Sequence, residues 1–501
     1  MSEPSIALNR FGLGARPKEP LPQDGPRWVS AQFDRFDARP SAIAALPSRK
    51  AIFGQLADYL QENRAFIMAA QGGGNADRQP GAKASPAMRA QSDGIDGRAN
   101  SDALAKDDPQ QNLRKFIGGV SRGNYIGQVG ARTAVAMGSQ TPFVERMVHF
   151  WANHFAVSAD KLTVIGVAGL LEFDAIRPHV LGKFGDMLGA VERHPSMLLY
   201  LDQAQSIGPN SQLGARVAAR GGRKLGLNEN LAREIMELHT LGVRTGYTQT
   251  DVTEFARAMT GWSVAGLARG PIARFARADG PPGDFVFVEQ IHEPGTRRIM
   301  GRSYDQSGER QAQSILDELA GHPATATHIA TKLARHFTGD NPPQSLIDRL
   351  QASFMATGGD LPALYATLIG SPEAWVTERP KFRTPWEWSI AAMRALSLNE
   401  IQPAIAAGLM NQLGQPVWKP GSPAGYDDVN ASWAGPDAIM RRVEAAERLA
   451  AKAGSTVDAR TIAERLFPGM LSPATRQILK NAESPQQAIA LLLVSPEAMR
   501  R

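Results

Sequence analysis

The chain has no cysteine in 501 residues, and this absence excludes several classes of protein at once. Disulfide-stabilised folds, zinc fingers, iron–sulfur proteins and enzymes with a thiol nucleophile all depend on cysteine. Histidine and carboxylate side chains would have to supply the ligands of any bound metal. The fold therefore depends on a buried apolar core, which a chain of this length can form.

Long apolar runs and clustered positive charge are also missing. No run of about eighteen apolar residues occurs, so we expect no membrane span. The first ten residues lack the basic start and apolar stretch of a signal peptide, which favours a cytoplasmic location. The net charge is only +6 and the basic residues are scattered, which argues against a nucleic-acid partner.

Common enzyme motifs are absent or stand in the wrong context. There is no Walker A loop, no dinucleotide glycine fingerprint and no His-Glu-x-x-His. The segment 119–123 fits the nucleophile-elbow pattern, but it follows a helical segment rather than a buried strand. Ser158 and Lys161 fit a Ser-x-x-Lys pattern without the partner motifs of penicillin-recognising enzymes. Both are interpreted as chance matches.

Helical periodicity is what the sequence does contain. It predicts a mainly α fold, a multi-helix single domain over 1–501 with a small β-hairpin element at 273–303. The hairpin strands are expected at 285–288 and 298–301, around a turn at 293–296, with a third strand near 273–276. Residues 71–111 have almost no large apolar side chains and are interpreted as a disordered insertion.

A candidate functional helix surrounds 145–155. Helical geometry places Glu145, His149 and Asn153 in one polar stripe, whereas His154 lies on the apolar side. We therefore expect His154 to be buried. A buried imidazole needs a hydrogen-bond partner, so His154 is either a core residue bonded to a carbonyl or part of a site.

The helix over 228–239 carries more charge. Glu229, Arg233, Glu234 and Glu237 fall within one arc, whereas His239 lies on the apolar side. The arc is either a solvated face with weak ion pairs within the helix or one wall of a cleft that supplies acid, base or metal-ligand oxygens. The sequence leaves both interpretations open.

Other histidines and the tryptophans receive structural interpretations. His194 precedes a proline and suits helix capping. His328, Lys332 and His336 share one helix face and are assigned to the surface or to packing. Core and interface packing is expected of the tryptophans at 262, 386, 388, 418 and 433.

Five segments, taken in order, resemble the signatures of the bacterial "domain of unknown function 1800" family. They are Phe-Trp-Ala-Asn-His-Phe at 150–155, His-Val-Leu-Gly-Lys-Phe at 179–184, His-Pro-Ser-Met-Leu at 194–198 with Leu-Asp at 201–202, the helix at 228–242, and Asp-Val through Thr-Gly-Trp at 251–262. The resemblance extends over nearly the whole chain apart from the insertion.

The resemblance implies a predominantly helical fold and no settled activity or cofactor. It also implies a possible partner, because such proteins are often encoded beside a protein that looks like the sulfatase and alkaline phosphatase superfamily. Many members look as though they are exported by the twin-arginine route, and this sequence lacks that signal.

The sequence leads to one functional hypothesis and one rival. The hypothesis is a polar site between helices, suited to hydrolytic or metal-assisted chemistry, formed by His154, Asp202, Glu229, Arg233, Glu234, Glu237 and His239. The rival is a noncatalytic binding or scaffold protein that assists the sulfatase- or phosphatase-like partner, with the same residues holding helices together. No cofactor is assigned.

Overall fold

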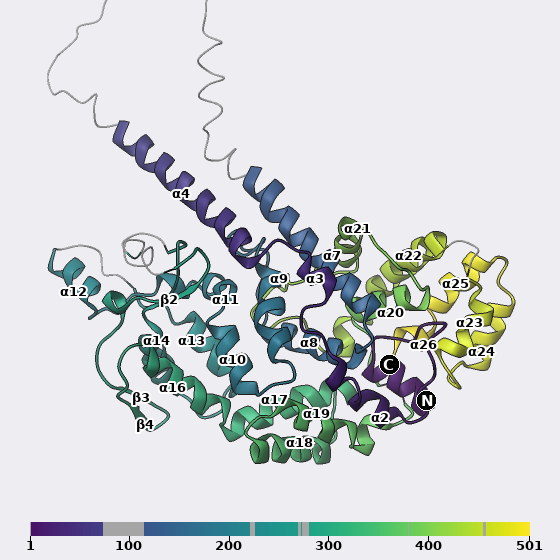
Figure 1. Cartoon of the computed structure of the whole chain (residues 1–501). Coiled ribbons are helices and arrows are strands. Elements are labelled where there is room, and N and C mark those ends of the chain that lie inside the picture. The colour runs from purple at the N-terminus through teal and green to yellow at the C-terminus, as the bar shows by residue number, and fades with distance from the viewer. Residues whose placement is uncertain are drawn as a thin grey trace, which may run out of the picture.

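The computed structural model of the chain (Figure 1) describes residues 2–73, 115–220, 226–268, 272, 280–378, 380–453 and 457–501, without the side chains of 64–73. The insertion predicted at 71–111 lies outside these residues from position 74 onward. The third strand expected near 273–276 lies outside them as well.

The fold is mainly α-helical, as predicted. The first described elements are α1 (Glu3–Ile6), the π-helical turn η1 (Ala7–Phe11), α2 (Gly25–Ser30), the 3₁₀ turn η2 (Phe33–Arg35) and α3 (Ser41–Ala44). Next come α4 (Arg49–Gly73), the π-helical turn η4 (Phe116–Ser121) and α7 (Arg122–Gly138). Figure 1 shows α4 and α7 extending from the body of the molecule as an arm.

The central helix is α8 (Pro142–His154), and the elements after it cover one side of the molecule (Figure 1). They are α9 (Ala168–Leu171), the turns η5 (Glu172–Ile176) and η6 (Arg177–His179), α10 (Phe184–Glu192), α11 (Pro195–Tyr200), η7 (Gln203–Gln205), α12 (Gln212–Ala219), α13 (Asn230–Glu234), the π-helical turn η8 (Ile235–His239) and α14 (Gln249–Met259).

The second half of the chain closes the lower edge and the other side in the same view. The lower edge holds α16 (Glu309–Ala320), α17 (Pro323–Thr338), α18 (Gln344–Thr357) and α19 (Leu361–Ile369). The far side holds α20 (Pro385–Ala395), α21 (Pro403–Gln412), α22 (Pro436–Ala453), α23 (Ala459–Leu466), α24 (Pro473–Lys480), α25 (Pro485–Leu493) and α26 (Pro496–Met499). Turn η11 (Pro372–Trp375) lies between α19 and α20, turn η12 (Asn430–Ser432) lies between α21 and α22, and turn η10 (Glu289–Ile291) precedes α16.

A small antiparallel β element is present, but the predicted strand pairing is wrong. Strand β2 (Phe285–Phe287) pairs with β1 (Trp262–Val264), and β3 (Arg297–Ile299) pairs with β4 (Arg302–Tyr304). The segment at 293–296 does not connect two paired strands, because β2 pairs with β1 instead. In this segment the buried Glu293 carboxylate accepts hydrogen bonds from Asn210 at 2.8 and 2.6 Å.

Local signals at helix ends are accurate. Thr248 and Asp251 form the predicted capping box at the start of α14. His194 caps α11 as predicted, since its Nδ1 accepts from the backbone N–H of Ser196 at 3.2 Å.

No helix in the described part of the chain is both long and apolar enough to cross a membrane.

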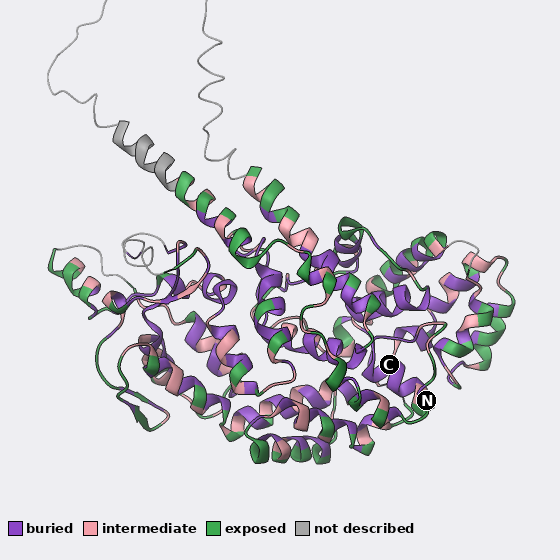
Figure 2. Cartoon of the chain, viewed as in Figure 1, coloured by how far each residue is buried: buried purple, intermediate pink, exposed green. Residues whose placement is uncertain are grey.

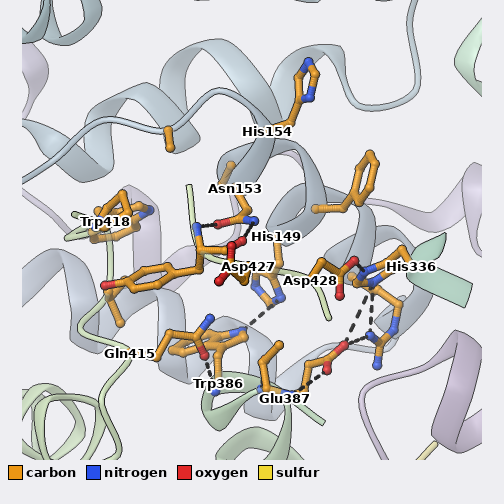
Figure 3. A pocket seen from close by; sticks show the side chains of 18 of the residues that line it. His149, Asn153, His154, His336, Trp386, Glu387, Gln415, Trp418, Asp427 and Asp428 are labelled. Carbon is orange, nitrogen blue, oxygen red and sulfur yellow. Dashed lines mark hydrogen bonds and ion pairs between the residues drawn. The ribbon is translucent and has the colours of Figure 1, made fainter. Parts of the chain in front are cut away.

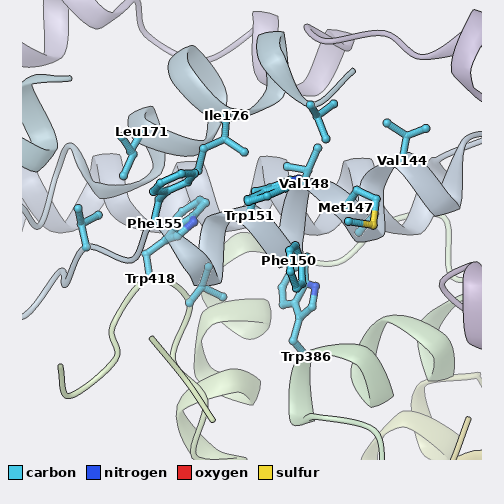
Figure 4. Close-up of a cluster of buried hydrophobic side chains, with 14 of the residues drawn as sticks. Val144, Met147, Val148, Phe150, Trp151, Phe155, Leu171, Ile176, Trp386 and Trp418 are labelled. Carbon is cyan, nitrogen blue, oxygen red and sulfur yellow. The ribbon is translucent and has the colours of Figure 1, made fainter. Parts of the chain in front are cut away.

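Helix α8 lies in the interior, as the burial colours of Figure 2 show. Its apolar side chains pack in the main core, which includes residues from Ile6 to Met499, and Figure 4 shows Val148 and Trp151 in this cluster. Within the polar stripe of α8, Glu145 is buried, whereas His149 and Asn153 are half-buried. Glu145 accepts two hydrogen bonds from Arg177, at 2.7 and 2.8 Å.

We predict that Glu145→Ala lowers the free energy of unfolding by about 3–5 kcal/mol, because Arg177 would stay buried without its carboxylate. Glu464→Ala is the matched control, since Glu464 pairs with Arg476 at 2.7 Å but both side chains are 51% exposed. The control should change stability by less than about 1 kcal/mol. Urea denaturation measures the free energy of unfolding of both variants. Equal effects would show that burial does not make the Glu145–Arg177 pair more important for stability than the exposed pair.

Candidate functional site

A cavity of about 230 Å³ lies between α8, α17, the start of α20 and the segment 415–428. Figure 3 shows side chains from these four regions around one space. The lining residues that matter for the chemistry are Arg132, His149, His154, Lys332, Arg335, His336, Trp386, Glu387, Trp418 and Asp428.

His154 ends α8 and is buried, as its position on the apolar side predicted. Its Nε2 lies 3.1 Å from the backbone oxygen of His239. Because a carbonyl oxygen only accepts hydrogen bonds, Nε2 must carry the proton. Burial and the charge of Lys332 hold the pKa of His154 well below 6.5. The ring is therefore neutral, and Nδ1 is left as an acceptor.

Lys332 of α17 donates to that acceptor, with Nζ 3.0 Å from Nδ1 of His154. Burial lowers the pKa of Lys332 to about 8; the Asp428 carboxylate opposes this effect and the Arg335 charge adds to it. A neutral amine can still donate one N–H to His154 and keep its lone pair. Lys332 therefore combines a fixed position with a proton that it can lose near neutral pH.

Glu387 is a buried carboxylate that lines the cavity at the start of α20. It forms a capping box with Thr384 at the start of α20, and its Oε1 accepts a hydrogen bond from Arg146 and forms an ion pair with Nη2 of Arg501 at 2.8 Å. Burial would raise the pKa of Glu387, but the charges of Arg501 and Arg146 outweigh it and hold the pKa well below 4.5. This carboxylate is ionised and held by two guanidinium groups.

Asp428 forms a second buried ionic contact. Its Oδ2 lies 2.9 Å from Nδ1 of His336, and its Oδ1 lies 2.8 Å from Nζ of Lys381. Burial would raise the pKa of Asp428, but His336, Lys381 and Arg501 together hold it well below its ordinary value. Burial lowers the pKa of His336 to about 4. The ring is thus a neutral donor to Asp428.

Two tryptophans line the cavity. Trp386 and Trp418 are buried in the core as predicted, and both also face the cavity. The guanidinium of Arg132 lies 4.1 Å from the centre of the Trp386 ring, and its Nε donates to both oxygens of Glu172 at 3.0 and 2.8 Å. Nε1 of Trp386 donates to Nδ1 of His149 at 3.1 Å.

The structure brings together His154 and His239, two of the residues predicted from the sequence. Their ring centres are 6.1 Å apart, and the backbone oxygen of His239 accepts from His154. Nδ1 of His239 is hydrogen bonded to Oε1 of Glu192 at 2.7 Å, and both of these side chains are fully buried. Glu192 was not among the predicted site residues.

The acidic arc of α13 and η8 does not line the cavity. Arg233 contacts Glu229 at 3.1 Å and Glu237 at 4.0 Å, and these side chains are about one-third exposed. Burial raises the pKa of Glu234. Asp202 lies elsewhere, paired with Lys161 at 2.7 Å. A chemical role for these residues stays a prediction.

Sequence reasoning assigned His328, Lys332 and His336 to the surface or to packing. Packing describes His328, whose Nε2 lies 3.1 Å from the backbone oxygen of Leu238, but Lys332 and His336 line the cavity. Their spacing on one helix face was visible in the sequence. The contact with His154 was not, because 178 residues separate His154 from Lys332.

In the part of the chain that the structure describes, no three histidine, aspartate or glutamate side chains are grouped so that they could hold a metal ion.

Comparison with protein families matches residues 6–500 to the family described as "Protein of unknown function (DUF1800)". The chain belongs to this family. The resemblance of the five sequence segments is thereby confirmed, and the DUF1800 match includes every residue that lines the cavity. No match was found among curated proteins or among solved structures.

Within this DUF1800 chain, the wall at 415–428 should depend on Gly425. Nδ2 of Asn153 donates to the backbone oxygen of Tyr426 and its Oδ1 accepts from the Tyr426 N–H, both at 2.8 Å. Gly425 has a φ of +81°, and a Cβ there would overlap the backbone oxygen of Asn153. Gly421 has open space around it and provides the matched control.

We predict that Gly425→Ala increases amide hydrogen exchange in 415–428 by about tenfold or more, equivalent to about 1.4 kcal/mol of local stability. Gly421→Ala should leave exchange in this segment nearly unchanged. Hydrogen-exchange mass spectrometry of the two variants and the wild type decides the matter. Similar exchange in all three would show that the contact with Asn153 does not hold this wall.

Proposed function

We propose that the cavity is an enzyme active site in which Lys332 accepts a proton from a bound substrate or from water, with His154 as its positioning residue. The contact between Nζ of Lys332 and Nδ1 of His154, 3.0 Å long and at the cavity wall, carries the proposal. The direction of this hydrogen bond is fixed. The backbone oxygen of His239 accepts from Nε2 of His154, so Nδ1 of His154 has no proton and accepts from Lys332.

The chemistry follows from the two protonation states of Lys332. A lysine with a pKa of about 8 has a minority of neutral amine at pH 7, and a general base works best when its pKa is near the working pH. The Lys332 ammonium formed after proton transfer lies near the ionised Asp428 carboxylate, which favours the charged state. The site can therefore take up a proton and return it.

Proton removal from water would give hydrolysis, the reaction class expected from the sequence. Proton removal from a carbon acid would use the same two residues. Metal-assisted chemistry and the wider cluster with the α13 carboxylates stay predictions, as does the rival scaffold role beside a sulfatase- or phosphatase-like protein. Stoichiometric metal in purified protein, lost on mutation of His154 or Glu234, would favour the metal-assisted hypothesis.

The groups that surround the Lys332 amine determine how its pKa responds to mutation. They are His154 from α8, His328 and Arg335 from α17, and Asp428 from the loop. Arg335 lowers the pKa of Lys332 by charge repulsion. Because no described residue forms a hydrogen bond or ion pair with the Arg335 guanidinium, it can be replaced without breaking a contact.

Competitive acetylation with trace acetic anhydride, followed by peptide mass spectrometry, measures this pKa directly. We expect Lys332 to titrate at about 8, compared with 10.5 for an unperturbed lysine. Arg335→Gln should raise the pKa of Lys332, since a repelling charge is lost. Arg310→Gln, at an exposed position of α16, should leave it unchanged.

The signal is assigned with Lys332→Met, which must abolish it. Two results would contradict a general base at this position. One is a pKa of Lys332 near 10.5, and the other is an equal shift of this pKa in Arg335→Gln and Arg310→Gln.

A further inference from the structure

The cavity wall contains hydrogen-bond donors that no described residue satisfies. Nε of Arg335 is buried without an acceptor, and its guanidinium has no carboxylate partner within the described residues. Arg132 uses only Nε in its contacts with Glu172, so its two terminal amino groups are unused by the rest of the described chain. Buried donors without acceptors cost about 1–3 kcal/mol each.

His149 adds a third donor. An indole nitrogen only donates, so the bond from Nε1 of Trp386 shows that Nδ1 of His149 has no proton. Burial and the charges of Arg132, Arg177 and Arg146 hold the pKa of His149 well below 6.5, which makes the ring neutral. Its proton is therefore on Nε2, which is buried and has no described acceptor.

The acidic groups of the cavity do not serve these donors. Glu387 is paired with Arg146 and Arg501, Asp428 is paired with His336 and Lys381, and Asp427 accepts a hydrogen bond from Ser432. The unsatisfied donors of Arg335, Arg132 and His149 therefore require acceptor oxygens that carry negative charge. Carboxylate and phosphate groups meet this requirement, because the planar guanidinium fork bonds their oxygens in pairs.

The rest of the wall suits an apolar group. The rings of Trp386 and Trp418 line the cavity beside the Arg132 guanidinium, whose centre lies 4.1 and 5.4 Å from the two ring centres, and Tyr426 lines it from the loop. A volume of about 230 Å³ lies below the range of roughly 300–1,000 Å³ for pockets that hold drug-sized ligands. The occupant is therefore small.

We infer that the cavity binds a small organic anion, a carboxylate or phosphate monoester on a flat apolar group, with the anionic oxygens at Arg335, Arg132 and His149. This names the substrate class of the proposed active site and rests on that proposal. The apolar group lies against Trp386 and Trp418, and Lys332 lies at the same cavity as the proton acceptor.

Titration calorimetry with simple probes tests the inference on the full chain. Benzoate and phenyl phosphate are the two anionic probes, and benzamide is the neutral probe of the same shape as benzoate. We expect at least one anion to bind with a dissociation constant of about 1 mM or lower, and about tenfold or more tightly than benzamide. Which anion binds better distinguishes a carboxylate from a phosphate ester.

Arg335→Gln should weaken binding of the preferred anion by about tenfold or more, since it removes a charge-assisted pair of hydrogen bonds. Arg335→Lys should weaken it less, because it keeps the charge but loses the planar fork. Arg310→Gln is the matched control and should bind as the wild type does. Melting temperatures confirm that each variant is folded.

The inference would be overturned by no binding of either anion, by benzamide binding as tightly as benzoate, or by full affinity in Arg335→Gln. Inorganic phosphate that binds as tightly as phenyl phosphate would show a site for the ion alone and would also overturn it. If an anion binds but Lys332 has the pKa of an unperturbed lysine, the ligand class is supported and only the general-base proposal is contradicted.

Discussion

Burial of a helix that carries five polar side chains is the constraint on which the structure depends. Glu145, Arg146 and His154 are buried and His149 and Asn153 are half-buried, so protein groups replace water as hydrogen-bond partners. Each of the five side chains forms a hydrogen bond with another segment of the chain. The contacts join Glu145 to Arg177, Arg146 to Gly12 and Glu387, His149 to Trp386, Asn153 to Tyr426, and His154 to His239 and Lys332.

The cavity is a consequence of the same arrangement. Hydrogen-bond partners of the polar side chains in the second half of α8 lie on α17, α20 and the loop at 415–428. These segments are also the walls of the cavity (Figure 3). Because α8 holds them by directional bonds, the polar atoms that face the cavity are fixed before any ligand arrives. Such preorganisation is what electrostatic binding and proton transfer require of an active site.

Sequence patterns predicted what depends on neighbouring residues and missed what depends on distant ones. Helix type, the capping box at Thr248 and the burial of His154 follow from local spacing, and the structure confirms them. The pairing of β2 was wrong because its partner β1 lies earlier in the chain, and local spacing does not show which strands meet. Lys332 was assigned to surface or packing for the same reason, since its partner lies on another helix.

The most direct test of the proposed site is the protonation of His154, observed by nitrogen-15 NMR of histidine-labelled protein and assigned with His154→Gln. We predict a neutral ring with the proton on Nε2 at pH 6.5 and above, since burial holds the pKa of His154 well below 6.5. A ring that becomes doubly protonated near pH 6.5, or a proton on Nδ1, would contradict it, because Lys332 would then have no acceptor.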